Sequence, residues 1–347
     1  MRGLRKYLTP FAPDQSGAVS VLFELGGIVV ICDAGGCTGN VCGFDEPRWF
    51  EQKSAIFSAG LRDMDAILGR DDRLVAKLAD VVQKIDATFV AVIGTPVPAV
   101  IATDYLALKR MSEKKIKLPI LTVDTDGMEL YDKGEEKAFL ELFKILAIEK
   151  YQAEEDRIGI LGMTPQDVSD LDAADKIRDL YQQKYGKQAV CYCMGDGLEE
   201  IREASSVSRN IVVSPAALMT AKYLEKTFGT PYEIHYPLVD ELIPDVDYTG
   251  KEVLIVHQQV IANSIRKELL KKGAKRVRIV SWFMMKKELL ADGDVLLRDE
   301  DAYIELVQNG DFDIIFADGC MERMIPEFKG IFVDTRHFAV SGKLIGK

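Results

Sequence analysis

Apolar residues in this chain gather in short continuous runs rather than in an alternating pattern. A strand that is covered on both faces of a parallel sheet needs continuous hydrophobicity, whereas a half-exposed strand alternates. The pattern therefore predicts a buried strand at each run. The predicted strands occupy residues 27–32, 88–94, 118–123, 157–163, 188–193, 210–214, 252–256, 276–282, 312–317 and 330–333.

Several stretches between these runs have the apolar spacing of an amphipathic helix. They predict helices over residues 71–84, 171–185, 216–228 and 259–272. Strands that alternate with helices are typical of an α/β fold built on doubly wound parallel sheets. The fold class predicted here is therefore α/β.

Two breaks divide the pattern into three Rossmann-like domains. Residues 149–157 are rich in charge, and residues 237–250 are rich in Asp, Pro and Gly without a helical period. A chain of 347 residues is long enough for about two or three domains. The predicted domains span residues 1–150, which carry a cysteine-rich loop, 151–246 and 247–347.

Composition and charge then exclude several classes of partner. The chain is 48% hydrophobic and 29% charged, as globular proteins are, and its net charge is −11. This acidity argues against binding to nucleic acid or to anionic lipid. The longest uncharged window, between Asp86 and Asp104, is broken by glycine and proline and is too short to span a membrane. No apolar signal segment follows the basic residues 2–6, so we expect a cytoplasmic protein.

Standard nucleotide motifs are missing from the sequence. No G-x-x-x-x-G-K-[S/T] loop occurs, and no G-x-G-x-x-G follows a predicted strand. G-x-S-x-G is also absent, which weakens a hydrolase interpretation. We therefore expect no cofactor that is bound by a nucleotide motif.

Functional groups of parallel sheets collect just beyond the carboxyl ends of the strands. This rule selects Asp196, Ser214, His257 and His337 as candidate catalytic residues of an inter-domain cleft. Either of these two histidines could donate protons, because imidazole titrates near neutral pH. A structural role is the alternative for each histidine.

Cysteines supply the most distinctive candidate chemistry. Cys32, Cys37 and Cys42 have C-x4-C-x4-C spacing in a glycine-rich stretch, which matches neither a zinc finger nor a ferredoxin run. Thiolates at a strand-to-helix loop suit an iron–sulfur cluster, expected to be 4Fe-4S. In a two-fold dimer, two thiolates per chain would make four ligands, with Asp33 as a further oxygen ligand. The alternative for Cys32 is a small hydrophobic residue at the end of a buried strand.

The other three cysteines have a different interpretation. Cys191 and Cys193 alternate along a predicted strand, so both are expected to face one side of it and to be structural. Cys320 follows Asp318-Gly319 at a strand end and is the stronger candidate for a second ligand site.

Loop motifs along the chain support a family resemblance. Residues 16–37 end in ICDAGGC, residues 61–74 read LRDMDAILGRDDRL, and residues 93–97 read IGTPV. Residues 195–201 read GDGLEEI, and residues 222–231 read KYLEKTFGTP. With residues 210–214 and 316–332, these segments resemble, in order, elements of the nitrogenase component 1 family. That family includes nitrogenase subunits and dark-operative protochlorophyllide reductase.

The resemblance implies three Rossmann-like domains with metal sites between them, but ligand positions differ. Of three positions that the family uses to bind its bridging cluster, only Cys37 is a cysteine here, with Ser16 and Thr95 at the others. Ser214 stands where the nitrogenase cofactor takes a cysteine, and residues 336–337 correspond to its histidine region. Hydroxyl oxygen is a poor substitute for soft sulfur, so we do not expect dinitrogen reduction.

Two functions remain open, and they leave open whether the chain is an enzyme. The first is an oxidoreductase component, a homodimer or a heterodimer with a related subunit. Its iron–sulfur cluster, held by Cys37 with Cys42 or Cys32 and flanked by Asp33 and Thr95, would accept electrons from a separate ATP-dependent reductase protein. It would reduce a small molecule or a tetrapyrrole-like substrate. The second is a non-catalytic scaffold that binds a metallocofactor or a small molecule.

Overall fold

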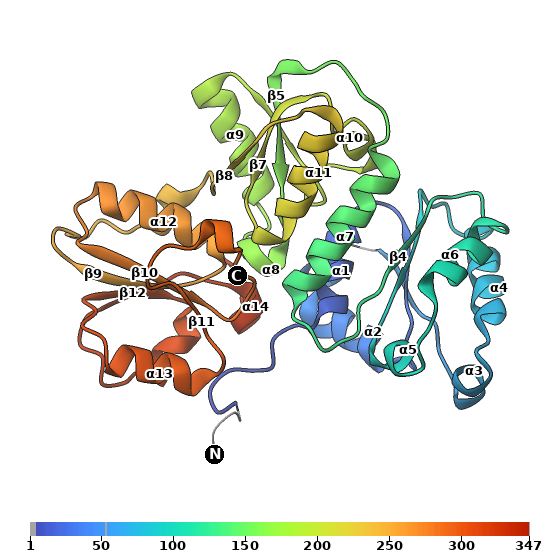
Figure 1. Ribbon diagram of the computed structural model, residues 1–347, viewed down its shortest axis with the longest axis horizontal. Coiled ribbons are helices and arrows are strands. Elements are labelled where there is room, and N and C mark those ends of the chain that lie inside the picture. The colour runs from blue at the N-terminus through green and yellow to red at the C-terminus, as the bar shows by residue number, and fades with distance from the viewer. Residues whose placement is uncertain (1–4, 53, 347) are drawn as a thin grey trace.

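The computed structural model describes residues 5–52 and 54–346 and contains three parallel β-sheets with helices on their faces (Figure 1). This arrangement confirms the predicted α/β class with three sheets. The domain boundaries at residues 150 and 246 stay a prediction, because buried clusters of side chains run across both of them.

Each sheet is built from strands that are close together in the sequence. The first has the order β2-β1-β3-β4, the second β6-β5-β7-β8 and the third β11-β10-β9-β12-β13, and all neighbouring strands are parallel. Their bounds are β1 (Ile28–Ile31), β2 (Ala55–Ser58), β3 (Val90–Ile93), β4 (Ile120–Val123), β5 (Glu154–Leu161), β6 (Gln188–Cys191), β7 (Val207–Val212), β8 (Tyr232–Ile234), β9 (Glu252–Val256), β10 (Arg276–Ser281), β11 (Val295–Leu296), β12 (Ile314–Ala317) and β13 (Ile331–Asp334).

All the predicted strands are confirmed, and β2, β8 and β11 are additional. These three lie at sheet edges, and none of them is buried along its length. The apolar runs of β2 and β11 are only three residues long, and Glu233 interrupts β8, which is why the hydrophobic pattern did not indicate these edge strands.

Helices cover the sheets and connect their strands. Their bounds are α1 (Asp14–Leu22), α2 (Gly36–Asn40), α3 (Asp63–Leu68), α4 (Asp71–Val82), α5 (Pro96–Val100), α6 (Tyr105–Glu113), α7 (Tyr131–Leu146), α8 (Pro165–Val168), α9 (Ala173–Tyr185), α10 (Leu198–Arg202), α11 (Leu218–Phe228), α12 (Gln259–Lys271), α13 (Glu300–Gln308) and α14 (Phe338–Ser341). Short 3₁₀ or π segments are η1 (Val41–Asp45), η2 (Pro47–Phe50), η3 (Pro215–Ala217), η4 (Val239–Leu242), η5 (Lys287–Leu289) and η6 (Gly319–Met324). The four predicted helices correspond to α4, α9, α11 and α12.

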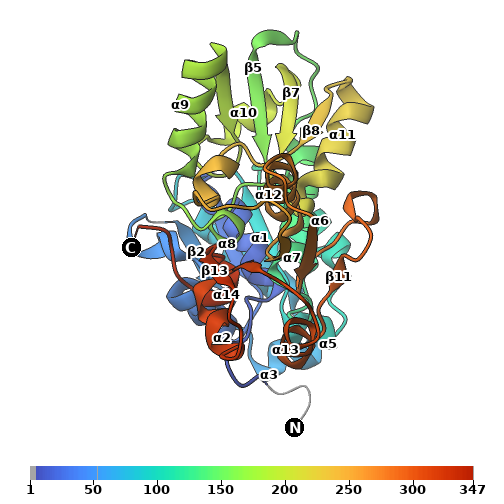
Figure 2. The same cartoon turned by 90° about the vertical axis from the view of Figure 1, so that its left-hand side faces the viewer.

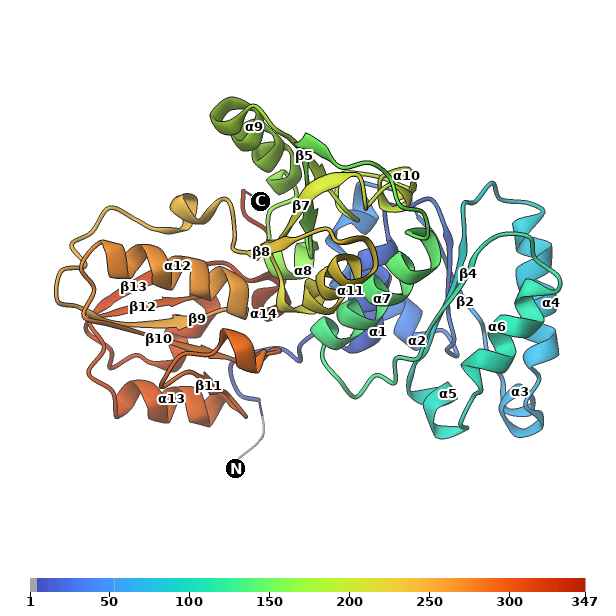
Figure 3. The same cartoon turned by 45° about the horizontal axis from the view of Figure 1, so that its top comes forward.

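Helices α1 and α7 pack together at the centre of the molecule (Figure 3). Every residue of α1 is buried. A Cβ atom at Gly17 would lie 1.9 Å from the carbonyl oxygen of Tyr131, and one at Gly134 would lie 1.7 Å from that of Asp14. Only glycine at these positions lets the two backbones approach so closely.

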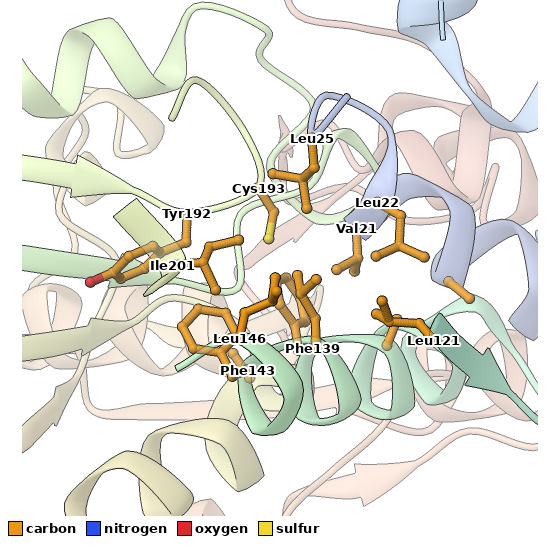
Figure 4. Close-up of a cluster of buried hydrophobic side chains, with 14 of the residues drawn as sticks. Val21, Leu22, Leu25, Leu121, Phe139, Phe143, Leu146, Tyr192, Cys193 and Ile201 are labelled. Atoms are coloured by element: carbon orange, nitrogen blue, oxygen red, sulfur yellow. The ribbon is translucent and has the colours of Figure 1, made fainter. Parts of the chain in front are cut away.

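Shared apolar clusters join the three sheets into one structure. One cluster joins Phe139 and Phe143 of α7 to Cys193, just after β6, and to Ile201 of α10, with Leu25 beside them (Figure 4). Another joins the second and third sheets, and α1, α8 and α14 meet near the middle of the molecule (Figure 2). No helix in the described part of the chain is long and apolar enough to cross a membrane.

We expect Gly134→Ala to lower the free energy of unfolding by about 3 kcal/mol, because the new methyl group would collide with the backbone of α1. Urea unfolding monitored by circular dichroism would measure this. Gly39→Ala is the matched control, since Gly39 lies in α2 with open space around its Cα. Equal midpoints for the two variants would contradict the proposed close contact.

Candidate functional site

The cysteine loop, residues 32–45, follows β1 at the carboxyl edge of the first sheet. The chain turns at Gly35, which has a φ of 120°, and then enters α2. The buried carboxylate of Asp33 accepts hydrogen bonds from the backbone N–H of Thr38 at 2.7 Å and from the Ser58 hydroxyl at 2.6 Å. Asp33 therefore holds the loop against β2.

The three thiols of this loop have different surroundings. Cys32 is buried in an apolar cluster, and burial raises the pKa of its thiol to about 12. Cys37 and Cys42 are half-buried. Burial also raises their pKa values, with further contributions from the carboxylates of Asp33 and Glu46 respectively. A cation such as iron would compensate these negative neighbours and favour the thiolate form.

The hydroxyls at the family's other two cluster positions lie close to this loop. Thr95 donates its hydroxyl hydrogen to the carbonyl of Cys32 at 2.7 Å, and it lies beside the Cys37 thiol, where it partly offsets the rise that burial causes in the pKa of Cys37. Ser16 donates to Asp45 at 2.6 Å. The fold thus brings Cys37 and Thr95 together. Within residues 5–52 and 54–346 of one chain, no three His, Cys, Asp or Glu side chains form a group that could hold a metal ion.

The two predicted histidines meet where the three sheets converge. His257 and His337 stack with their ring centroids 4.3 Å apart and their planes 11° apart. His257 accepts from the N–H of Gln258 at Nδ1 (2.8 Å), and its Nε2 lies 3.1 Å from the Arg336 carbonyl. Burial and the neighbouring His337 lower the pKa of His257 well below its usual value. His257 is therefore neutral at physiological pH.

A buried polar network extends from His337. The phenol of Tyr131 donates to Asp167 and lies 3.0 Å from Nε2 of His337. On the next turn of α7, Glu135 accepts from the Thr164 hydroxyl at 2.6 Å. Burial, aided by the charge of Asp167, raises the pKa of Glu135 well above its usual value.

Asp132 adds a further buried carboxyl group in the first turn of α7. It accepts a hydrogen bond from the backbone N–H of Met284, which connects α7 to the third sheet. Burial raises the pKa of Asp132 to about 6, although this hydrogen bond lowers it. The sequence analysis missed four residues of this network: Tyr131, Asp132, Glu135 and Asp167. In a sequence, a carboxylate near the start of a helix cannot be distinguished from a capping or solvated residue.

The other two predicted catalytic residues have local partners. Ser214 is buried at the start of η3, where its hydroxyl accepts from the N–H of Ala216 at 3.2 Å. Asp196 pairs with Arg178 at 2.8 Å and accepts from the N–H of Cys191 at 2.6 Å. The structure thus brings the two histidines together, and it gives Ser214 and Asp196 positions within separate loops of the second sheet.

Cys191 and Cys193 do not face one side of a strand, contrary to the prediction. β6 ends at Cys191, and Cys193 has a φ of 67° beyond it. The turn therefore sends the two side chains into different apolar clusters. Cys320 is half-buried in η6 of the third sheet, beside the carboxylate of Asp318.

A cleft of about 960 Å³ lies next to the cysteine loop and the histidine centre. Its walls come from residues 9–13, from Phe44 and Asp45 of the cysteine loop, and from residues 338–344. Gln166 and Phe338, the chain neighbours of Asp167 and His337, also line it. The buried network therefore lies directly behind one wall of the cleft.

Comparisons with known proteins agree with the resemblance seen in the loops. A family model described as "Nitrogenase component 1 type Oxidoreductase" matches residues 14–240. The chain is 29% identical over 181 residues to a nitrogenase iron-molybdenum cofactor biosynthesis protein NifE from Clostridium pasteurianum, an alignment that covers 51% of this chain and 38% of the relative. It is 23% identical over 189 residues to the NifE protein of Bradyrhizobium diazoefficiens, which covers 51% of this chain and 32% of that relative.

Solved structures extend the likeness to the whole fold. Nitrogenase Cp1 at pH 6.5 superposes with a TM-score of 0.72 at 12% identity, over 96% of this chain and 87% of that one. Nitrogenase Cp1 at pH 5 gives a TM-score of 0.69 at 15% identity, over 96% of this chain and 84% of that one. The third sheet therefore shares the fold although the family model ends before it.

We expect the buried Asp132 carboxyl to make stability depend on pH. Its folded pKa of about 6 lies above the usual value of 3.8, so its contribution to stability is present at low pH and is lost as the pH rises through 6. Between about pH 4 and 7, ionisation of Asp132 should lower the free energy of unfolding of the wild type by about 3 kcal/mol, and Asp132→Asn should not show this decrease. Thermal unfolding across this range would measure it, with the exposed Asp124→Asn as control. Parallel curves for wild type and Asp132→Asn would refute this assignment.

Proposed function

The chain belongs to the family of nitrogenase component 1 type oxidoreductases, and on this premise we propose that it is an electron-accepting component that binds an iron–sulfur cluster between two subunits. The cluster would be held by Cys37 and Cys42 from each subunit. Cys32 is the third thiol of the loop, but its Sγ lies in hydrocarbon, and Asp33 is occupied in holding the loop.

The observation that carries this proposal is a set of exposed apolar side chains on the loops that follow β1, β3 and β4, at the same sheet edge as the two half-buried thiols. Phe44 is 77% exposed, Val100 of α5 is 85% exposed, and Met128 after β4 is 83% exposed. All three lie after the carboxyl ends of strands of the first sheet, as Cys37 does. A protein surface rarely exposes so many large apolar side chains together unless another protein covers them.

The donor set of this face fits a shared cluster. Two thiols per chain become four sulfur ligands when a second copy, or a related subunit, covers the face. The hydroxyl hydrogen of Thr95 is donated to the Cys32 carbonyl, so we assign Thr95 to holding the loop beside Cys37 rather than to ligation. When bound, the cluster would supply single electrons, and an ATP-dependent iron–sulfur reductase protein would be their source.

The cleft beside the cysteine loop is the proposed substrate site. Its walls include Phe11, Phe44 and Phe338, and its charged residues are Asp45 and Lys343. These surroundings suit a largely apolar small molecule of tetrapyrrole-like size with an anionic group. His337, immediately before Phe338, is the proposed proton donor, because hydrogen bonds at both ring nitrogens hold His257 neutral.

Dinitrogen reduction does not fit the centre of the molecule. Side chains of Tyr131, Phe283 and the stacked histidines fill this region, and Ser214 offers a hydroxyl that already caps η3. Asp196, which is paired with Arg178, is assigned a role in shaping its loop. We place the protein in the cytoplasm, in keeping with the acidic charge of its sequence.

A second candidate is a non-catalytic scaffold for metallocofactor assembly. It is favoured by the two NifE relatives, both of which are cofactor biosynthesis proteins, and by Ser16 and Thr95 at family cluster positions. The alignments cover 38% and 32% of those relatives, so the activity of the whole relatives does not transfer directly. A scaffold would release its metal cluster to an acceptor protein, whereas an electron carrier would retain it through reduction and reoxidation.

Anaerobic reconstitution should give about two iron atoms and two sulfides per chain, equivalent to one 4Fe-4S cluster per dimer. Cys37→Ser should lose most of the iron and the charge-transfer absorbance, because oxygen is a poor ligand for a soft site. Cys320→Ser, at the half-buried cysteine of the third sheet, should keep the iron content if the cluster binds at the cysteine loop and not at that second candidate ligand. Metal-free protein, or an unchanged iron content in Cys37→Ser, would refute the proposal.

Val100→Glu should shift the protein from dimer to monomer in sedimentation velocity, since a carboxylate would be buried without a partner in the interface. The melting temperature should hardly change, because this side chain is 85% exposed in the single chain. Ile148→Glu, at a residue that is 70% exposed after α7, should leave the dimer intact. A wild-type chain that is monomeric both alone and with a related subunit would contradict the interface.

A further inference from the structure

The phenol of Tyr131 sits between two groups that exchange protons. It contacts Asp167 on one side and Nε2 of His337 on the other, at 3.0 Å, while Asp167 Oδ1 and His337 Nε2 are 3.7 Å apart. All three side chains are buried. Each comes from a different sheet's connections, α7, α8 and the loop before α14, so the contact exists only in the assembled fold.

Several oxygen atoms around this contact are buried without a hydrogen-bond partner. Among the described residues these include Oε2 of Glu135, Oδ2 of Asp167 and Oε1 of Gln166. An unpaired carboxylate oxygen is costly in such a site, whereas a protonated carboxyl group avoids the charge. Glu135 and Asp167 repel each other when both are ionised, which favours a state in which the pair retains a proton.

We propose that His337, Tyr131 and Asp167 form a proton wire that serves the cleft, and that the neighbouring carboxyl group of Glu135, which feels the charge of Asp167, holds a proton beside it. The inference rests on the proposed function, because reduction of a molecule in the cleft takes up protons together with electrons. In the transfer step, protonated His337 gives its Nε2 proton to the Tyr131 oxygen while Tyr131 gives its own proton to Asp167. The reverse step returns the proton to His337, and no other bond changes.

The stacked His257 leaves the mobile proton to His337. Both nitrogen atoms of His257 are engaged with backbone groups, and two parallel rings 4.3 Å apart are unfavourable when both are charged. His337 is held from its backbone side by Asp318, which accepts its N–H at 3.0 Å. This contact fixes the ring beside Tyr131.

Charged groups approach the carboxyl group of Glu135 from three directions. Asp132 lies on the same helix as Glu135, and Asp167 approaches from α8. The guanidinium of Arg48 is the positive group that favours ionisation of Glu135, but it is itself bound by Glu46 and Glu24. Burial and the two carboxylates outweigh Arg48, so the pKa of Glu135 stays well above its usual value.

Gln166 and Phe338 connect the wire to the cleft. Both line the cleft, and their chain neighbours Asp167 and His337 are the ends of the wire. The amide nitrogen of Gln166 donates to the carbonyl of Asp45, at the cleft wall. Its Oε1 is a buried acceptor without a hydrogen-bond partner, so in the proposed wire it is the polar group between the cleft and Asp167.

Infrared difference spectroscopy of the full chain without metal tests the proposal. At neutral pH we expect the C=O band of a protonated carboxyl group, absent in Glu135→Gln and present in the control Glu136→Gln, whose carboxylate pairs with Lys286. After rapid transfer to D₂O, this band should shift before core amides exchange. Tyr131→Phe should slow the shift about tenfold or more with unchanged circular dichroism, and Gln166→Leu should slow it similarly.

The possible results separate the two proposals. Absence of the protonated band, or a wild-type exchange rate in Tyr131→Phe, would overturn the wire. Slow exchange in Tyr131→Phe with a wild-type rate in Gln166→Leu would overturn its connection to the cleft. Because the measurement needs no cluster, a failed iron reconstitution would refute the proposed function while the exchange rates still decide the wire.

Discussion

The close approach of α1 and α7 is the contact on which the rest of the structure depends. Gly17 and Gly134 lack the two Cβ atoms that would separate these helices. A Cβ atom at either position would lie less than 2 Å from a backbone oxygen of the other helix, well inside van der Waals contact. This contact fixes the N-terminal end of α7 where the three sheets converge. Tyr131, Asp132 and Glu135 then project from one helix into contacts with the second and third sheets.

Two neighbouring regions of the molecule have opposite chemical character. The cysteine loop lies at an edge with exposed apolar side chains, and its thiols Cys37 and Cys42 are half-buried. The histidine centre is closed and polar, and burial raises the pKa values of its carboxyl groups Asp132 and Glu135 because it opposes their charge. The cleft lies between them, which places a source of electrons and a source of protons on different walls of one site in the proposed function.

Sequence pattern was most informative where burial on both faces imposes one residue type. Continuous apolar runs predicted β1, β3 and the other core strands, whereas the edge strands β2 and β11 have apolar runs too short to be recognised as strands. Helix α1 was not predicted as an amphipathic helix, because it is buried on all sides and lacks a polar face. Cys193 was misplaced because a residue with positive φ ends the alternation of its strand.

By itself the sequence determined the α/β class, the three parallel sheets and the position of a cysteine-bearing loop, since these follow from local hydrophobicity and from the rule that strands end in functional loops. It also indicated His257 and His337 as candidate functional residues. Only the tertiary structure decided that these rings stack, that Cys32 is buried while Cys37 stays half-exposed, and that Tyr131 joins Asp167 to His337. Asp167 and His337 meet Tyr131 there although they lie 36 and 206 positions away from it along the chain. The protonation of a buried carboxyl group depends on such distant neighbours, which no local sequence pattern records.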